Sequence, residues 1–98
     1  MKVAVIGAGW AGIAAAVEAT AQSHRVTLYD MAPQFGGRAR SVEINGLMLD
    51  NGQHIMIGAY TELLRLMRLV GADSQRLLLR TPLALLDASG EGLRLSPG

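Results

Sequence analysis

The chain has 98 residues, half of them hydrophobic, which suits one small globular domain. Nine basic and eight acidic residues leave a formal net charge of +1, so charge gives no reason to expect a nucleic-acid partner. The chain has no cysteine, which excludes disulfides, thiolate metal sites and thiol catalysis. We expect no metal site and take a reducing, cytoplasmic environment as the default.

The first thirty residues have the pattern of a strand, a helix and a second strand. Residues 2–6 form an apolar run rich in β-branched residues that ends at Gly7, which is typical of a strand buried on both faces. Residues 10–22 are rich in alanine and predict a helix. Residues 25–29 form a second run of strand-forming residues that ends at Asp30. This order predicts one right-handed βαβ unit.

The turn between the first strand and the helix carries a nucleotide-binding pattern. Residues 7–12 read G-x-G-x-x-G directly after a predicted strand and at the start of a predicted helix, a context that makes the pattern specific. The first glycine permits the tight turn, the second lets a pyrophosphate approach, and the third lets helix and strand pack closely. The helix N-terminus adds N–H groups and a positive dipole end. The predicted phosphate site comprises Gly7, Ala8, Gly9, Trp10, Ala11 and Gly12.

An acidic residue ends the second predicted strand. The carboxylate of Asp30 can accept hydrogen bonds from the adenosine ribose hydroxyls, and it would repel the 2′-phosphate of NADP. The next residue, Met31, is assigned to the same site. The glycines and Asp30 together indicate FAD or NAD and do not distinguish between them.

The rest of the chain departs from the simple alternation of strands and helices. Residues 35–38 predict a loop, and Asn45-Gly46 is a strong turn signal for a hairpin over residues 41–49. Residues 61–70 predict an amphipathic helix that stops at Gly71. Residues 77–79, 83–86 and 93–95 predict short strands. The predicted class is α/β: a Rossmann-like, dinucleotide-binding βαβ unit, then a β-hairpin, a helix and further short strands.

The loop after the second strand carries a family resemblance. Gly36, Gly37, Arg38 and Ser41 match a G-G-R-x-x-S/T stretch, and here the sequence resembles the amine oxidase and phytoene desaturase group of flavoproteins. That family usually has glutamate at the position of Asp30. The shorter aspartate side chain is still long enough to contact the ribose. The resemblance implies FAD as the cofactor, with Arg38 near its phosphates, where a guanidinium suits phosphate oxygens. It also implies that Gly36 and Gly37 let backbone N–H groups approach the cofactor.

A narrower resemblance covers nearly the whole chain. Residues 49–54, 58–62 and 69–73 look like the squalene-associated FAD-dependent desaturases, also called hydroxysqualene dehydroxylases. This implies a full-length enzyme of hopanoid or carotenoid biosynthesis that desaturates or reductively dehydroxylates a squalene-type isoprenoid. It places Asn51, Gly52, Gln53 and His54 towards the flavin and the substrate. His54 can titrate near neutral pH, but a loop histidine bonded to backbone is an equal alternative. No residue is assigned a catalytic role.

Members of that family are several times longer than this chain. Residues 1–98 are therefore expected to be an incomplete domain, the N-terminal part of an FAD-binding domain without the substrate domain. We expect no turnover by the chain alone, and self-association through uncovered sheet edges and apolar faces. The arginines on the predicted helix and after it suggest peripheral contact with an anionic membrane as one option, although a solvated helix face is the simpler account.

Two other functions remain open at this point. One is an NAD-binding module of a small dehydrogenase, which the Gly-Gly-Arg stretch and the hairpin argue against. The other is a non-catalytic nucleotide-binding fragment that needs a partner chain. The first would prefer NAD to FAD, and the second would bind an adenine nucleotide without redox chemistry.

Overall fold

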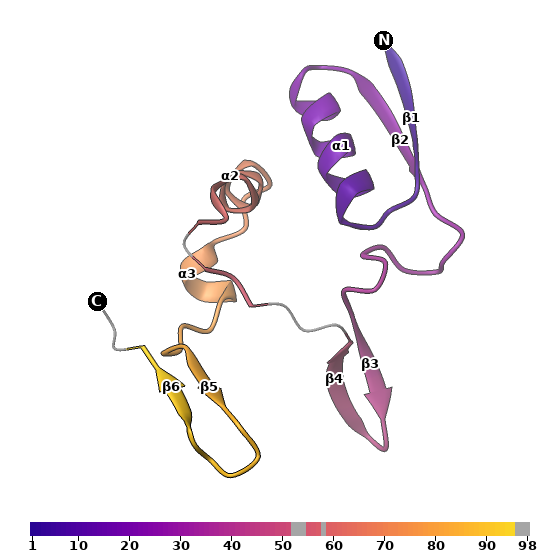
Figure 1. Ribbon diagram of the computed structural model, residues 1–98. Helices are drawn as coiled ribbons and strands as arrows, with labels where there is room; N and C mark the ends of the chain where they lie inside the picture. Colours follow the sequence, from indigo (N-terminus) through magenta and orange to yellow (C-terminus); the bar gives the residue numbers. More distant parts are fainter. Residues whose placement is uncertain (52–54, 58, 96–98) are drawn as a thin grey trace.

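The computed structural model describes residues 1–51, 55–57 and 59–95. The chain begins with β1 (Lys2–Ile6), α1 (Trp10–Ala21) and β2 (Arg25–Tyr29). β1 and β2 pair in parallel along their whole length, and α1 packs against this pair (Figure 1). The predicted βαβ unit is confirmed.

Only one face of the β1–β2 sheet is covered among the residues that the structure describes. Both strands alternate exposed and half-buried residues, and α1 lies on the half-buried side, over Val26 and Leu28. The side chain of Ile6 on the other face is 80% exposed. The prediction of a first strand buried on both faces is therefore wrong here. A continuous apolar run fits a two-sided environment, but the described residues supply only one covering layer.

Two antiparallel hairpins follow later in the chain. The first pairs β3 (Arg40–Ile44) with β4 (Leu47–Asn51). Its turn residues Asn45 and Gly46 have φ values of 52° and 79°, as expected for the tight turn that Asn-Gly favours. The second hairpin pairs β5 (Ala84–Leu86) with β6 (Gly92–Arg94). The hairpin at 41–49 and the strands near 83–86 and 93–95 are confirmed.

Two helices lie between the hairpins. α2 (Thr61–Leu69) stops before Gly71, as predicted. Gly71 has a φ of +76°, and its N–H donates to the carbonyl of Arg68 at 3.1 Å. α3 (Ser74–Leu77) includes the first residue of the strand predicted at 77–79, and the other two leucines belong to no helix or strand. Asp73 accepts a hydrogen bond from the N–H of Gln75 at 2.9 Å and caps α3. The strand prediction was wrong because this capping signal precedes the leucine run and starts a helical turn before it.

The elements spread out instead of closing around one core. The described part of the chain contains three separate two-stranded sheets, and Ala8 is the one buried hydrophobic residue in it. The radius of gyration is 17.3 Å, against about 13 Å for a compact domain of this length. The expectation of one small globular domain is thus not met, because these elements face one another over little apolar surface. None of the described helices has the length and apolar character needed to span a bilayer.

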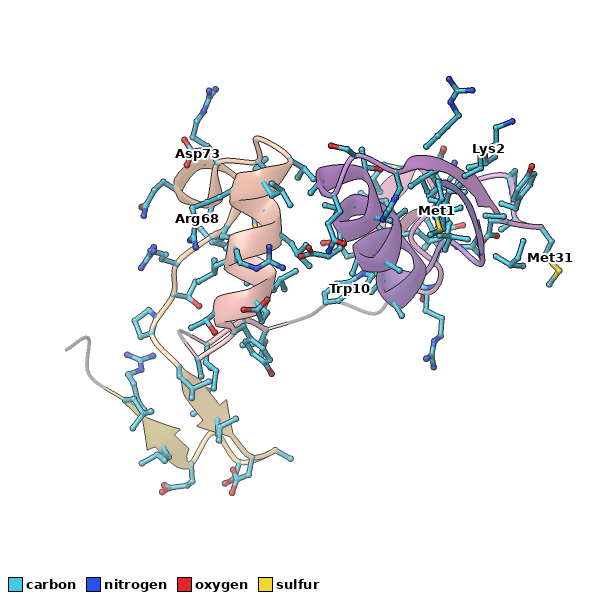
Figure 2. All side chains as sticks on the ribbon, turned by 90° about the horizontal axis from the view of Figure 1, so that it is seen from above. Met1, Lys2, Trp10, Met31, Arg68 and Asp73 are labelled. Atoms are coloured by element: carbon cyan, nitrogen blue, oxygen red, sulfur yellow. The ribbon has the colours of Figure 1, made fainter. Side chains whose placement is uncertain are left out.

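An ion pair joins the βαβ unit to α2. Arg65 of α2 is paired with Glu18 of α1 and, at 2.9 Å, with Glu62 on its own helix. These hydrogen bonds, that to Glu18 first, raise the pKa of Arg65 above its usual value. Figure 2 shows the two helices side by side. A groove of about 440 Å³ beside them is lined by Val17, Leu69 and other residues of α1, β2 and the end of α2, and none of its lining residues belongs to the turn at 7–12.

Candidate nucleotide-binding site

The turn between β1 and α1 is held in a conformation that requires glycine at its first position. Gly7 has a φ of +99°, in the region that only glycine adopts without strain. Its N–H donates to the carbonyl of Tyr29 at 2.7 Å, which ties the turn to the end of β2. Ala8, the next residue, is fully buried. The chain then enters α1 through Gly9, the residue before its first turn.

The second and third glycines of the turn have different surroundings. A Cβ added to Gly12 would lie 1.7 Å from the carbonyl oxygen of Gly7, so the absence of a side chain lets α1 pack on the turn. A Cβ added to Gly9 would meet no atom within 4 Å. Gly9 therefore borders open space at the N-terminus of α1. Both positions have the geometry that the motif predicts, namely close packing at Gly12 and room for a ligand at Gly9.

The first turn of α1 contains no acidic side chain to offset the positive end of the helix dipole. Gly9 supplies no side-chain cap. The first N–H groups of a helix have no acceptor within the helix, and with the dipole they favour an anion there. Trp10 begins the helix and its side chain is 48% exposed; Figure 2 labels it at this end of α1. Ala11, which follows it, is exposed.

Asp30 lies against the same turn. One carboxylate oxygen accepts the N–H of Ala8 at 2.6 Å, and the other accepts the N–H of Ala32 at 2.7 Å. The bond from Ala8, and then that from Ala32, lower the pKa of Asp30 below its ordinary value of 3.8 and outweigh desolvation. The carboxylate is therefore ionised at neutral pH. The side chain of Met31 points away from the βαβ unit and is fully exposed (Figure 2), so the structure does not bring it against the turn.

The Gly-Gly-Arg loop folds back onto the turn. The N–H of Gly36 donates to the carbonyl of Ala8 at 2.7 Å. Gly36 and Gly37 have φ values of +113° and +63°, and a Cβ on Gly37 would lie 3.2 Å from the Cα of Gly9. Two glycines are thus needed for this close backbone approach. Arg38 follows them and is exposed.

The remaining predicted site residues lie at the end of the first hairpin. Asn51 pairs with Arg40 in the β3–β4 register, and both are exposed. The hairpin therefore places Asn51 beside Arg40, two residues after the Gly-Gly-Arg loop. Gly52, Gln53 and His54 lie outside the described residues. The structure thus brings Gly7 to Gly12, Asp30, Gly36 and Gly37 together, whereas Met31, Arg38 and Asn51 are exposed.

The two backbone hydrogen bonds of Asp30 were not predicted from the sequence. We expected this carboxylate to face a ribose, whereas the structure also gives it two protein donors. The bond to Ala32 had a local signal, because an aspartate commonly accepts the N–H two residues ahead of it. The bond to Ala8 had none, because it depends on how the end of β2 meets the turn after β1.

Comparison with known proteins places this geometry in a family. The sequence family described as NAD(P)-binding Rossmann-like domain matches residues 5–69. A chloroplastic/chromoplastic zeta-carotene desaturase of Zea mays is 46% identical over 78 residues, which are 79% of this chain and 14% of that protein. A hydroxysqualene dehydroxylase of Zymomonas mobilis is 37% identical over 71 residues, 70% of this chain and 17% of that protein. The chain thus spans a small part of the length of these relatives.

The same arrangement of elements occurs in a solved structure. A redesigned putrescine oxidase superposes with a TM-score of 0.64 over 98% of this chain and 21% of that chain, at 23% sequence identity. The predicted Rossmann-like fold and the resemblance to the desaturases are therefore confirmed, and the putrescine oxidase shares the fold. The family match covers more than half of the chain, and we conclude that this protein belongs to the family of NAD(P)-binding Rossmann-like domains.

Proposed function

We propose that this chain binds FAD, as the nucleotide-binding part of an oxidoreductase that acts on an isoprenoid substrate. The observation that carries the proposal is the loop of Gly36, Gly37 and Arg38 folded onto the turn at residues 7–12, with Gly36 bonded to Ala8. The loop adds a second backbone segment and an arginine beside a glycine turn that alone serves FAD and NAD equally.

The residues around the turn fit a dinucleotide. The open space beside Gly9 leaves room for the pyrophosphate at the N-terminus of α1. Arg38 is exposed and directly follows Gly37, which lies against Gly9. Its guanidinium stays charged at any physiological pH, so it can bind phosphate oxygens in a fork. Asp30 is ionised and can accept a ribose hydroxyl with its remaining lone pairs. Bound FAD would supply the hydride acceptor, while this chain would bind and orient the adenosine and pyrophosphate half.

The substrate class rests on the relatives. The names of two of them specify zeta-carotene and hydroxysqualene, and both compounds are long isoprenoids. We infer desaturation or reductive dehydroxylation of such a molecule by the whole enzyme, with no turnover by this chain alone. The zeta-carotene desaturases match at higher identity than the hydroxysqualene dehydroxylase, so the proposal names the isoprenoid class and no single substrate. A cytoplasmic location, with peripheral contact to a membrane, is part of the same proposal.

A ligand panel tests the cofactor assignment. The purified chain is titrated by calorimetry with FAD, NAD, NADP and ADP, and Gly9→Ala serves as the variant that fills the space next to the turn. We expect FAD and ADP to bind, NADP to bind weakest because Asp30 repels its 2′-phosphate, and Gly9→Ala to abolish binding while remaining folded. Binding of FAD that is unchanged in Gly9→Ala would contradict the proposed site.

Preferential binding of NAD would favour the second candidate function. The family description names NAD(P), and the glycine turn with Asp30 suits NAD as well as FAD. In that case the chain would be the NAD-binding module of a dehydrogenase. Binding of ADP and FAD with equal affinity, without flavin reduction by any added electron donor, would instead favour a non-catalytic nucleotide-binding fragment that needs a partner chain.

A further inference from the structure

The carboxylate of Asp30 occupies an unusual place for a group that would only meet a ribose. Both of its oxygens already accept short hydrogen bonds from backbone N–H groups, those of Ala8 and Ala32. Ala8 is fully buried, so without this acceptor its N–H would be left without water or a partner. A buried backbone donor that loses its acceptor is costly. The bond from Ala8 to Asp30 is therefore part of what fixes the turn.

The peptide groups on both sides of Ala8 are held by hydrogen bonds to other segments of the chain. The N–H of Gly7 donates to the carbonyl of Tyr29 at 2.7 Å, and the carbonyl of Ala8 accepts the N–H of Gly36 at 2.7 Å. Asp30 completes the set by taking the N–H of Ala8 at 2.6 Å. β2 and the loop after it thus hold Ala8 at both its N–H and its carbonyl. The N–H of Ala8 faces the protein, which leaves the N-terminus of α1 as the anion-binding end.

We infer that Asp30 is a positioning residue for the phosphate-binding turn, because its carboxylate holds the backbone of Ala8 in the binding geometry before any nucleotide arrives. This role is separate from a hydrogen bond to the ribose, and it rests on the proposed nucleotide-binding function. The contribution of Asp30 to affinity therefore comes through the turn, and it persists for a ligand that has no ribose hydroxyls.

Two ligands separate the positioning role from ribose recognition. ADP and 2′,3′-dideoxyadenosine 5′-diphosphate differ only in the ribose hydroxyls. Asp30→Asn removes the negative charge and replaces one carboxylate oxygen by an amide NH2 group, so the bond from Ala8 is either lost or becomes a weaker bond to a neutral oxygen. We expect Asp30→Asn to weaken both ligands by about tenfold or more, as for the loss of a bond to a charged group. Weakening of ADP with unchanged binding of the dideoxy ligand would assign Asp30 to the ribose alone and overturn the inference.

A ligand-free measurement keeps the inference testable if the chain binds no nucleotide. In an amide NMR spectrum of the free protein, we expect Asp30→Asn to move the Ala8 proton upfield and to speed its exchange with solvent. Asp73→Asn is the matched control, because Asp73 accepts the N–H of Gln75 at the start of α3 and makes no bond to the turn. An Ala8 amide that responds equally to both variants would overturn the positioning role. Failure of the wild-type chain to bind ADP or FAD would count against the proposed function only.

Discussion

The three glycines of the phosphate turn share one motif but serve different physical ends. Gly7 has a φ of +99°, Gly12 lies against the carbonyl of Gly7, and Gly9 borders open space. Gly7 and Gly12 are therefore required by the fold itself, whereas Gly9 is required only by a ligand. This division allows folding and binding to be separated by single substitutions.

A matched pair of alanine variants tests that division. In Gly12→Ala the new Cβ would lie 1.7 Å from the oxygen of Gly7, so α1 must shift. We expect a loss of about 1–3 kcal/mol in the free energy of unfolding, together with loss of FAD binding. In Gly9→Ala the new Cβ meets nothing within 4 Å, so the free energy of unfolding should hold while FAD binding is lost. Urea denaturation and calorimetry measure the two effects, and equal destabilisation by both variants would contradict this account.

Asp30 gives the turn a defined response to acid. Its pKa is lowered from 3.8 by the bonds from Ala8 and Ala32, so its stabilising effect is fully present above pH 3.8. That effect is lost as pH falls through the lower, folded-state value. We expect the stability of the wild-type protein to fall as the pH drops below 3.8. The stability of Asp30→Asn should fall less over the same pH range, because this variant has no carboxylate at position 30 to protonate. Thermal unfolding from pH 2.5 to pH 7 measures this difference, and parallel pH profiles for the two proteins would exclude the contribution.

At the scale of elements, patterns within a few residues were predictable and contacts between distant segments were not. The Asn45-Gly46 turn and the Gly71 stop were both read from the sequence because a single backbone conformation at each site demands those residues. The strand predicted at 77–79 was wrong, since the cap at Asp73 starts α3, which takes in Leu77, and no strand follows it there. The bond from Gly36 to Ala8 and the pairing of Glu18 with Arg65 join segments far apart in the chain. No local pattern specifies such contacts.

The stability of the β3–β4 hairpin should be sensitive to substitution at Gly46 and tolerant of glycine at Asn45. Gly46 has a φ of +79°, so Gly46→Ala places a side chain in the left-handed region at a cost of about 1–2 kcal/mol. Asn45 has a φ of 52°, and Asn45→Gly should be tolerated there. Native-state hydrogen exchange is expected to speed up in β3 and β4 for Gly46→Ala while β1 and β2 keep their protection. Loss of protection in β1 and β2 as well would show that the hairpin and the βαβ unit unfold together.

Arg65 should anchor α2 to the βαβ unit by charge. Arg65→Met keeps the apolar stem but removes the pairing with Glu18 and Glu62. Because both partners are partly exposed, we expect a small fall in the thermal midpoint that disappears at high salt. Arg68→Met is the control, since Arg68 is exposed on the same helix (Figure 2). An equal, salt-independent fall in both variants would show that the ion pair contributes nothing.

At the scale of the whole molecule, much apolar surface stays exposed in the described part of the chain. One face of the β1–β2 sheet is uncovered, and the side chains of Leu85 and Leu93 in the second hairpin are about 60% exposed. Composition alone suggested a globular domain because it counts apolar residues and cannot say which surfaces meet. Exposed strand edges and apolar faces favour association with other chains.

We therefore expect self-association that depends on concentration. Sedimentation velocity of the wild-type chain should show a growing dimer or larger species as concentration rises. Thr27 lies on the uncovered face of the sheet, and Thr27→Lys should shift the equilibrium towards monomer. Gln22→Lys adds the same charge just beyond α1 and should leave association unchanged. A wild-type chain that remains a compact monomer at every concentration would contradict this expectation.

The nucleotide that the purified chain retains shows whether the turn and the Gly-Gly-Arg loop bind a flavin cofactor. The chain is purified without added cofactor, its visible absorbance is recorded, and the protein is then denatured and the released nucleotide identified by chromatography and mass. If no nucleotide copurifies, the refolded chain is offered FAD and NAD together and the bound fraction is analysed in the same way. We expect FAD to be recovered from the wild-type chain and to be absent from Gly9→Ala prepared in parallel. Recovery of NAD in its place would contradict the assignment of this turn and its Gly-Gly-Arg loop to a flavin cofactor.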